Sequence, residues 1–195
     1  MNKTIEYYNN NAEKFILDTQ AVSMSEIQKE FIKRIPSGGK ILDLGCGSGR
    51  DSKAFIDAGY SVVAVDGSQK MCDATSKLTG QPAICSTFQE YKTDEVFDGI
   101  WACASLLHLS FDEIENVIRT LSQDLAVGGC FYMSFKYGAF CGERNGRYFT
   151  DLDEEHFQTL IERVPFLKLE TLMLSSDVRP GRENEKWLNC FCSRI

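Results

Sequence analysis

The chain has 195 residues, a length typical of one domain with a substantial core, and its 43% hydrophobic and 25% charged residues are ordinary for a globular protein. A net charge of −7 argues against a nucleic-acid partner, because phosphate binding needs a basic surface. The N-terminal segment lacks the apolar core of a secretory signal, and the longest apolar runs are too short to span a membrane.

Three helices follow from apolar residues at helical spacing. The first begins at a Ser23–Glu26 capping box, continues through an apolar stripe and ends at Pro36. The second begins at a Ser110–Glu113 capping box and ends at Gly128-Gly129. The third is closed by Pro165. The three stripes are, in chain order, Ile27, Phe31, Ile32 and Ile35; Ile114, Val117, Ile118, Leu121 and Leu125; and Phe157, Leu160, Ile161 and Val164.

Apolar runs between these helices predict strands. Four are clear, at residues 40–44, 61–66, 97–104 and 129–135, and three are weaker, at 82–86, 167–175 and 186–194. Strands alternating with helices indicate an α/β, three-layer sandwich around a mainly parallel sheet. The last two strands have no helix between them, so we expect an antiparallel hairpin at one edge and an antiparallel last strand.

The sequence ILDLGCGSGRDS (41–52) follows the first clear strand with three glycines. Gly45, Gly47 and Gly49 give GxGxG, in which the third glycine comes one position too early for the dinucleotide-binding pattern GxGxxG. Glycine allows either a tight structural turn or a close approach of the backbone to a ligand. A turn in this position of a doubly wound sheet is where nucleotides bind.

Further motifs appear in a fixed order. Asp43 lies two positions before the first glycine, Asp66 ends the second strand, and the sequences EVFDGIWACASLLHLS (95–110) and AVGGCFYMSFK (126–136) follow. Over roughly residues 38 to 136 the chain therefore resembles the class I S-adenosylmethionine (AdoMet) methyltransferases. The LLHL and SFK forms are most similar to the small-molecule branch, including the tellurite-resistance methyltransferases. This resemblance implies a Rossmann-like seven-stranded sheet.

The resemblance also implies a cofactor site. Asp66 would bind the ribose hydroxyls. The family's third strand usually ends near an Asp that contacts adenine, but this chain has Thr87 and Phe88 there. The whole implied set is Asp43, Gly45, Cys46, Gly47, Asp66, Gly67, Met71, Thr87, Phe88, Cys103 and Ala104. Two alternative interpretations need no cofactor. In one, the glycines form only a structural turn; in the other, Asp66 is an acid at a helix N-terminus, where it stabilises the helix dipole.

The acceptor is expected at the carboxyl ends of the strands. Two segments far apart in sequence bring basic residues there, namely Lys136, Arg144 and Arg147, and Arg179 and Arg182. These residues suit an anionic acceptor, or else form ordinary surface ion pairs. In related enzymes an N-terminal helix closes the pocket and offers a tyrosine, for which Tyr7 and Tyr8 are candidates. His108 is a candidate general base and Tyr8 a second catalytic candidate; simple packing is the alternative for each.

The eight cysteines lie mostly inside apolar runs and form no CxxC pair, which favours a reduced, cytoplasmic protein without a metal site. We expect a single domain over residues 1–195, with a helical cap (1–36), a cofactor half (37–135) and a substrate half (136–195). The expected reaction is in-line methyl transfer from AdoMet to a small, anionic molecule. Alternatives are a protein or tRNA methyltransferase of the same fold and a non-catalytic AdoMet-binding protein.

Overall fold

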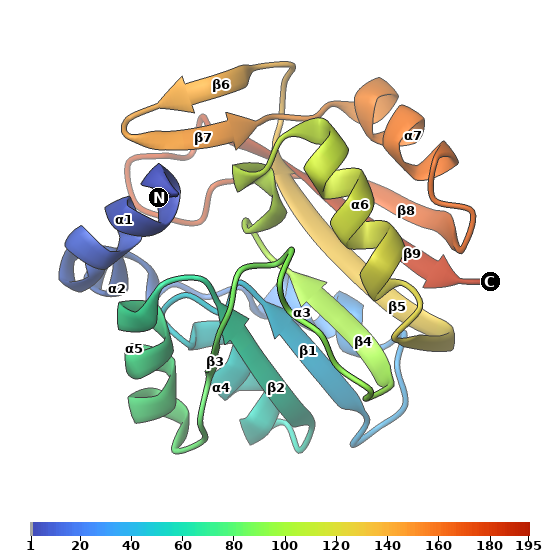
Figure 1. Cartoon of the computed structure of the whole chain (residues 1–195), viewed down its shortest axis with the longest axis horizontal. Helices are drawn as coiled ribbons and strands as arrows, with labels where there is room; N and C mark the ends of the chain where they lie inside the picture. The colour runs from blue at the N-terminus through green and yellow to red at the C-terminus, as the bar shows by residue number, and fades with distance from the viewer. Residues whose placement is uncertain (1) are drawn as a thin grey trace.

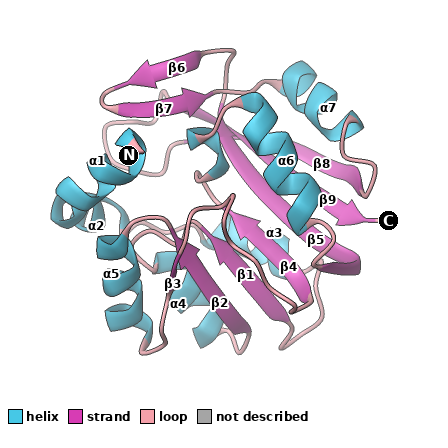
Figure 2. Ribbon diagram, viewed as in Figure 1, coloured by secondary structure: helices cyan, strands magenta, loops and turns pink. Residues whose placement is uncertain are grey.

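The computed structural model describes residues 2–195 and contains one seven-stranded sheet (Figures 1 and 2). Six strands point in the same direction, and β9, which is antiparallel to both of its neighbours β5 and β8, is the exception. The predicted fold class is therefore confirmed, including the antiparallel last strand. In spatial order the strands are β3 (Ile84–Cys85), β2 (Ser61–Asp66), β1 (Lys40–Leu44), β4 (Phe97–Ala102), β5 (Leu125–Lys136), β9 (Lys186–Arg194) and β8 (Leu167–Ser176).

Helices cover both faces of the sheet. On one face, Phe31 from α3 (Ser25–Ile32) and Phe55 from α4 (Arg50–Asp57) pack around Trp101 of β4. On the other face, the apolar stripes of α6 (Phe111–Leu121) and α7 (Glu154–Glu162) join the larger core cluster. The helix α5 (Gln69–Thr79) packs beside β2 and β3. The apolar spacing read from the sequence thus produces a three-layer arrangement (Figure 1).

Of the two predicted capping boxes, one is confirmed and one is wrong. The Ser110 hydroxyl accepts from the N–H of Glu113, whose carboxylate accepts from the N–H of Ser110 at 2.8 Å. By contrast, α3 starts after Met24 without a side-chain cap, and the Ser23 hydroxyl accepts from the N–H of Ser25. The SxxE spacing is present there, but the helix begins at Ser25, one residue later than a Ser23 cap would place it.

The N-terminal segment, expected as one helix, forms two. They are α1 (Lys3–Asn10), capped by the Asn2 side chain, and α2 (Ala12–Thr19). Asn11 separates them because its backbone leaves the helical region, with φ −116° and ψ 19°. Both helices lie beside the end of β2 and the start of α5 (Figure 1), at the edge where the parallel strands end.

A second, two-stranded sheet was not predicted. It pairs β6 (Cys141–Arg144) with β7 (Arg147–Thr150) in an antiparallel hairpin that lies next to α1 (Figure 1). Asn145 and Gly146 form its turn with positive φ angles of 53° and 76°. An Asn-Gly pair between short strands is the usual signal of such a turn, so this hairpin was readable from the sequence. Within residues 2–195, no helix has the length and apolar character required to cross a bilayer.

Candidate active site

The glycine turn after β1 approaches two other strands closely. The N–H groups of Gly45 and Cys46 both donate to the carbonyl of Val65 on β2, at 2.8 and 3.0 Å. A Cβ added to Gly45 would lie 2.3 Å from the Cβ of Ser105, which follows β4. Gly45 and Gly47 also have positive φ angles, of 87° and 54°. A side chain at Gly45 would collide with Ser105, so glycine is required for the turn to lie this close to the strand ends. The backbone of the turn also lines a pocket.

Asp66 lies where it was predicted, at the end of β2 and in the wall of the same pocket. Its carboxylate accepts from the N–H of Gly47 at 3.0 Å and from the N–H of Ser68 at 2.8 Å. Burial raises the pKa of Asp66, and these two hydrogen bonds oppose that rise. The carboxylate is therefore fixed beside the glycine turn, with lone pairs left for a ligand that donates hydroxyl groups.

Asp43 does not line the pocket, although it was predicted to bind the cofactor. Its side chain is 2% exposed, lies under the turn, and accepts from the Ser52 hydroxyl at 2.5 Å. Burial and the nearby Asp51 raise the pKa of Asp43 to about 7. Asp51 lines the pocket instead and accepts from the side chains of Arg50 (2.8 Å), Gln28 (2.7 Å) and Trp101 (3.0 Å). Sequence analysis missed Arg50 and Asp51 as site residues, although they directly follow the glycines.

One pocket of about 450 Å³ joins the two predicted sites. Thr87 and Phe88 line it after β3, so the positions that replace the family's Asp do reach the cavity. Ala104 has an unusual φ of 52° and its N–H donates to the Ser134 hydroxyl at 2.8 Å, which shapes the wall after β4. The predicted cofactor residues that line the pocket are Gly45, Cys46, Gly47, Asp66, Gly67, Met71, Thr87, Phe88, Cys103 and Ala104.

In the wall of the same pocket, Tyr8 and His108 form a hydrogen-bonded pair. The Tyr8 hydroxyl lies 2.8 Å from Nε2 of His108, and Nδ1 of His108 lies 2.7 Å from the carbonyl oxygen of Tyr148. Burial lowers the pKa of His108 to about 4. Because an imidazole with that pKa is neutral at pH 7 and both its nitrogens are engaged, His108 has no free nitrogen to offer a substrate.

Arg147 is the pocket-lining arginine for which residues 2–195 provide no carboxylate within 4.0 Å. Its Nη1 donates to the Tyr8 hydroxyl at 3.3 Å, and its Nε is buried without a partner. The guanidinium carbon lies 4.6 Å from the ring centre of Tyr7 and 5.1 Å from that of Phe149. The aromatic rings hold this cation in place without neutralising it.

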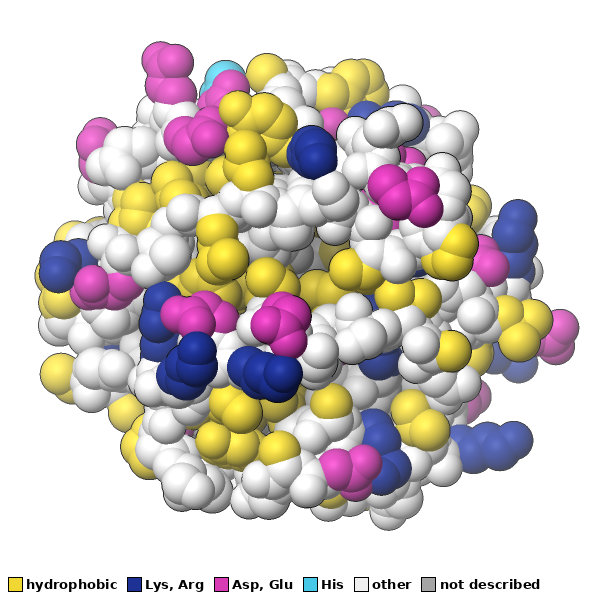
Figure 3. All heavy atoms as spheres, turned by 180° about the vertical axis from the view of Figure 1, so that it is seen from behind, with side chains coloured by type: hydrophobic (Ala, Val, Ile, Leu, Met, Phe, Trp, Pro, Cys, Tyr) yellow, Lys and Arg dark blue, Asp and Glu magenta, His cyan; other side chains and the backbone are white. Residues whose placement is uncertain are grey.

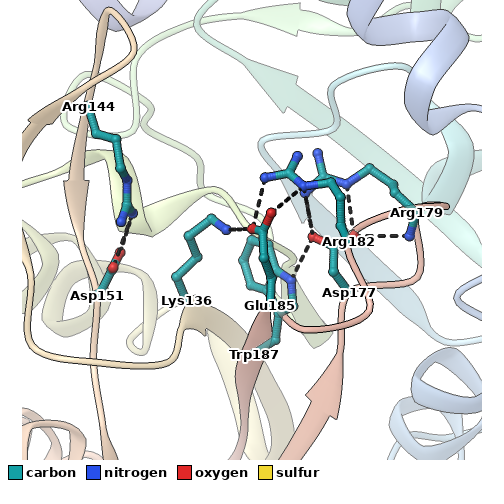
Figure 4. Close-up of polar contacts among 8 residues, drawn as sticks. All are labelled: Lys136, Arg144, Asp151, Asp177, Arg179, Arg182, Glu185 and Trp187. Carbon is teal, nitrogen blue, oxygen red and sulfur yellow. Dashed lines mark hydrogen bonds and ion pairs between the residues drawn. The ribbon is translucent and has the colours of Figure 1, made fainter.

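The other predicted cations are paired with acids (Figure 4). The Arg179 Nε donates to Asp177 at 2.9 Å, and the Arg182 Nε donates to Glu185 at 2.6 Å. Lys136 also pairs with Glu185 and lies 5.1 Å from the ring centre of Trp187. These arginines hold the pKa of Asp177 and of Glu185 below their usual values. Lys136, Arg179 and Arg182 line the pocket, but much of their charge is already compensated.

Two further candidates lie outside the pocket wall. Arg144 pairs with Asp151 at 2.9 Å and lies 4.7 Å from the ring centre of Phe140, apart from the Asp177 cluster (Figure 4). Tyr7 covers the Arg147 guanidinium but does not line the cavity. His156 is exposed and bonded to Asp153, away from the site. Among residues 2–195 no group of three His, Cys, Asp or Glu side chains could hold a metal ion.

Residues 41–129 match the family model described as a methyltransferase domain. A cypemycin N-terminal methyltransferase from a Streptomyces species is 31% identical over 101 residues, which are 49% of this chain and 41% of that protein. The chain spans 41% and 52% of the lengths of two curated relatives that it matches.

Solved structures share the fold over nearly the whole chain. A Burkholderia thailandensis 1,6-didemethyltoxoflavin-N1-methyltransferase, crystallised with that molecule and S-adenosylhomocysteine, has a TM-score of 0.77 at 16% identity and covers 98% of this chain and 87% of its own. A TehB-like methyltransferase from Corynebacterium glutamicum has a TM-score of 0.71 at 19% identity and covers 98% of each chain. At these identities the likeness establishes the fold.

Proposed function

Because the chain belongs to the class I S-adenosylmethionine-dependent methyltransferase superfamily, we propose that it transfers a methyl group from AdoMet to a small, anionic molecule. The observation that carries this proposal is the continuity of one pocket, which runs from Asp66 and the glycine turn to Tyr8 and the unpaired Arg147. A cofactor at one end and an acceptor at the other would then meet inside a single cavity.

The residues at the cofactor end suit AdoMet. The carboxylate of Asp66 would accept hydrogen bonds from the ribose hydroxyls, and Gly47 would leave room for the ligand beside it. Met71, Thr87 and Phe88 would enclose the adenine, and Arg50 together with Asp51 lies where a charged methionine moiety could be held. When bound, AdoMet supplies a methyl group activated by its sulfonium. The chain contributes alignment and exclusion of water.

The acceptor end favours an anion. Lys136, Arg179 and Arg182 bring three positive charges to the pocket wall against the two negative charges of Asp177 and Glu185. Arg147 adds a positive charge with no acidic partner in the described chain. A carboxylate or phosphate on the acceptor would complete the hydrogen bonding of Arg147. Tyr8 and His108 lie beside it as the catalytic candidates.

Two alternatives differ in the partner. A peptide with a free N-terminus is the second candidate, favoured by similarity to the cypemycin N-terminal methyltransferase. A tRNA acceptor is disfavoured, because the face shown in Figure 3 carries Lys and Arg beside Asp and Glu, whereas phosphate backbones need a basic surface.

Calorimetry with AdoMet and with NAD tests the cofactor, and conversion of AdoMet to S-adenosylhomocysteine in a small-molecule cell extract tests the reaction. We expect AdoMet binding, no NAD binding, and turnover that depends on the extract. Binding without turnover in extracts that also contain peptides and tRNA would instead indicate a non-catalytic AdoMet-binding protein.

A further inference from the structure

The tautomer of His108 is fixed by its neighbours. A backbone carbonyl can only accept a hydrogen bond, so Nδ1, which lies 2.7 Å from the Tyr148 oxygen, must carry the ring proton. In the neutral ring Nε2 is then an acceptor, and the partner at 2.8 Å is the Tyr8 hydroxyl. Tyr8 therefore donates its only proton to His108.

This arrangement leaves only lone pairs on the Tyr8 oxygen. One of them accepts from Arg147 Nη1 at 3.3 Å, and Tyr8 lines the pocket. A ligand atom that approaches Tyr8 must therefore bring its own hydrogen. A thiolate, a carboxylate oxygen or a metalloid anion has no hydrogen to donate at this place.

The charge beside Tyr8 restricts the ligand further. Arg147 is a permanent cation for which residues 2–195 provide no carboxylate partner, and the cofactor of the proposed reaction adds a sulfonium. Two positive charges disfavour an ammonium group at the same place, since like charges at close range destabilise the protonated form. A neutral amine or hydroxyl is the form that fits.

We propose that the methyl acceptor presents a neutral N–H or O–H nucleophile that donates a hydrogen bond to Tyr8, while an anionic group of the same molecule binds Arg147. The inference rests on the methyl transfer proposed above and adds the class of the nucleophilic atom. Tyr8 is the catalytic residue in contact with the acceptor, and His108 is a positioning residue that keeps the Tyr8 lone pairs directed to the pocket.

The proton and electron pairs balance as follows. The nucleophile's lone pair forms the bond to the methyl carbon while the S–C bond breaks, and the electron pair of that bond remains on sulfur. The methylated atom then carries one proton too many. It holds that proton in its hydrogen bond to the Tyr8 oxygen and gives it up to water as the product leaves the pocket. His108 stays neutral throughout, because burial disfavours the imidazolium.

Nitrogen-15 NMR of the histidine ring tests the starting arrangement without any acceptor. Spectra of the wild type and of the His156→Gln variant identify the His108 signals, because the chain has only two histidines. We expect a neutral ring at pH 7, protonated on Nδ1. Protonation on Nε2 instead would make Tyr8 free to donate and would overturn the proposal.

The second test identifies the nucleophile from the product. AdoMet carrying carbon-13 in its methyl group is incubated with the enzyme and a small-molecule cell extract, and the carbon shift of the transferred methyl reports the atom that received it. An N-methyl or an ether O-methyl group supports the proposal. An S-methyl group, a base-labile methyl ester or a methylated metalloid overturns it while leaving the proposed methyl transfer intact. No labelled product despite AdoMet binding overturns both.

Variants then test whether the Tyr8 hydroxyl contacts the acceptor or whether the Tyr8 ring only packs against its neighbours. Tyr8→Phe keeps the ring, which lies 5.0 Å from that of Phe15, and removes only the hydroxyl. We expect the transfer rate to fall roughly tenfold or more while AdoMet affinity is retained. Tyr137→Phe is the matched control, because it removes an exposed tyrosine hydroxyl whose partner is Glu154. Equal rates for the two variants would contradict the role of Tyr8.

Discussion

The carboxylate of Asp66 accepts from the backbone N–H of Gly47 at 3.0 Å, which joins the end of β2 to the glycine turn after β1. The residue proposed to recognise the ribose thus also fixes the loop proposed to face the cofactor. The two strands are neighbours in the sheet, and their register places Leu44 opposite Val65. Ligand recognition and loop geometry are therefore coupled at this point.

Asp66→Ala is expected to weaken AdoMet binding by roughly tenfold to a hundredfold, because it removes a charged acceptor worth about 1.5–3 kcal/mol. Calorimetry of the folded variant measures this change. Asp73→Ala is the control, since that exposed aspartate accepts from Gln69 on the same helix. An unchanged affinity in Asp66→Ala would remove this residue from the cofactor site.

Gly47→Val is expected to abolish AdoMet binding while the sheet remains folded. Gly47 has a φ of 54° and an added Cβ would lie 3.4 Å from the Phe15 ring, within the pocket wall. Gly80→Val isolates the backbone strain, because Gly80 has a φ of 73° and no atom within 4 Å of an added Cβ. Circular dichroism checks folding and calorimetry checks binding. If both variants bind AdoMet alike, the turn is only structural.

Asp43 gives a prediction about stability and pH. Its pKa of about 7 in the folded protein exceeds the ordinary value of 3.8, mainly because it is buried. Folded protein therefore retains a proton that the unfolded chain has lost, and the associated stability is full below about pH 4 and declines as pH rises through about 7. The amide side chain of the Asp43→Asn variant cannot titrate. As pH rises from about 4 to about 7, the free energy of unfolding of this variant should therefore increase relative to that of the wild type.

Denaturant unfolding between about pH 4 and 8 measures that difference. Asp57→Asn, on the exposed end of α4, serves as the control. The same gain in both variants would show that the buried Asp43 carboxyl is not its source. Because Asp43 lies under the turn rather than in the pocket wall, we expect AdoMet affinity to change little in Asp43→Asn.

The sequence predicted the sheet well because its strands are short apolar runs separated by amphipathic helices, as in β1 and α6. It predicted the general position of Asp66 for the same reason, since a residue that ends a parallel strand must lie at the carboxyl edge. Periodicity cannot show what lies beneath a turn. The sequence therefore placed Asp43 in the pocket, whereas its side chain is buried beneath the turn and bonded to Ser52.

The arginines show a second limit of sequence reasoning. Topology correctly brought Arg147, Arg179 and Arg182 to one pocket, but a list of charges does not tell which of them are already paired. Asp177 follows β8 and is two residues from Arg179, so a local ion pair was available to that arginine. Within residues 2–195, Arg147 has no acidic partner and lies against aromatic rings of α1 and β7, a contact that no sequence spacing reveals.

The last prediction separates these arginines by function. Arg147→Ala should raise the KM for the acceptor by roughly tenfold to a hundredfold and leave AdoMet affinity unchanged, since it removes a charged donor from the acceptor end alone. Arg147→Lys should restore little of this loss, because lysine keeps the charge but lacks the planar fork and the stacking on Tyr7. Arg163→Ala, which removes an exposed arginine paired with Glu115, is the control.

Arg179→Ala should behave differently from Arg147→Ala. It leaves the buried carboxylate of Asp177 without its closest cation, so we expect a lower free energy of unfolding and a smaller effect on KM. The double variant Arg179→Ala/Asp177→Asn removes the charge on both partners and should recover part of that stability. Kinetics with the identified acceptor and denaturant unfolding distinguish the two arginines. A neutral acceptor, or an unchanged KM in Arg147→Ala, would show that this cation serves packing and not substrate binding.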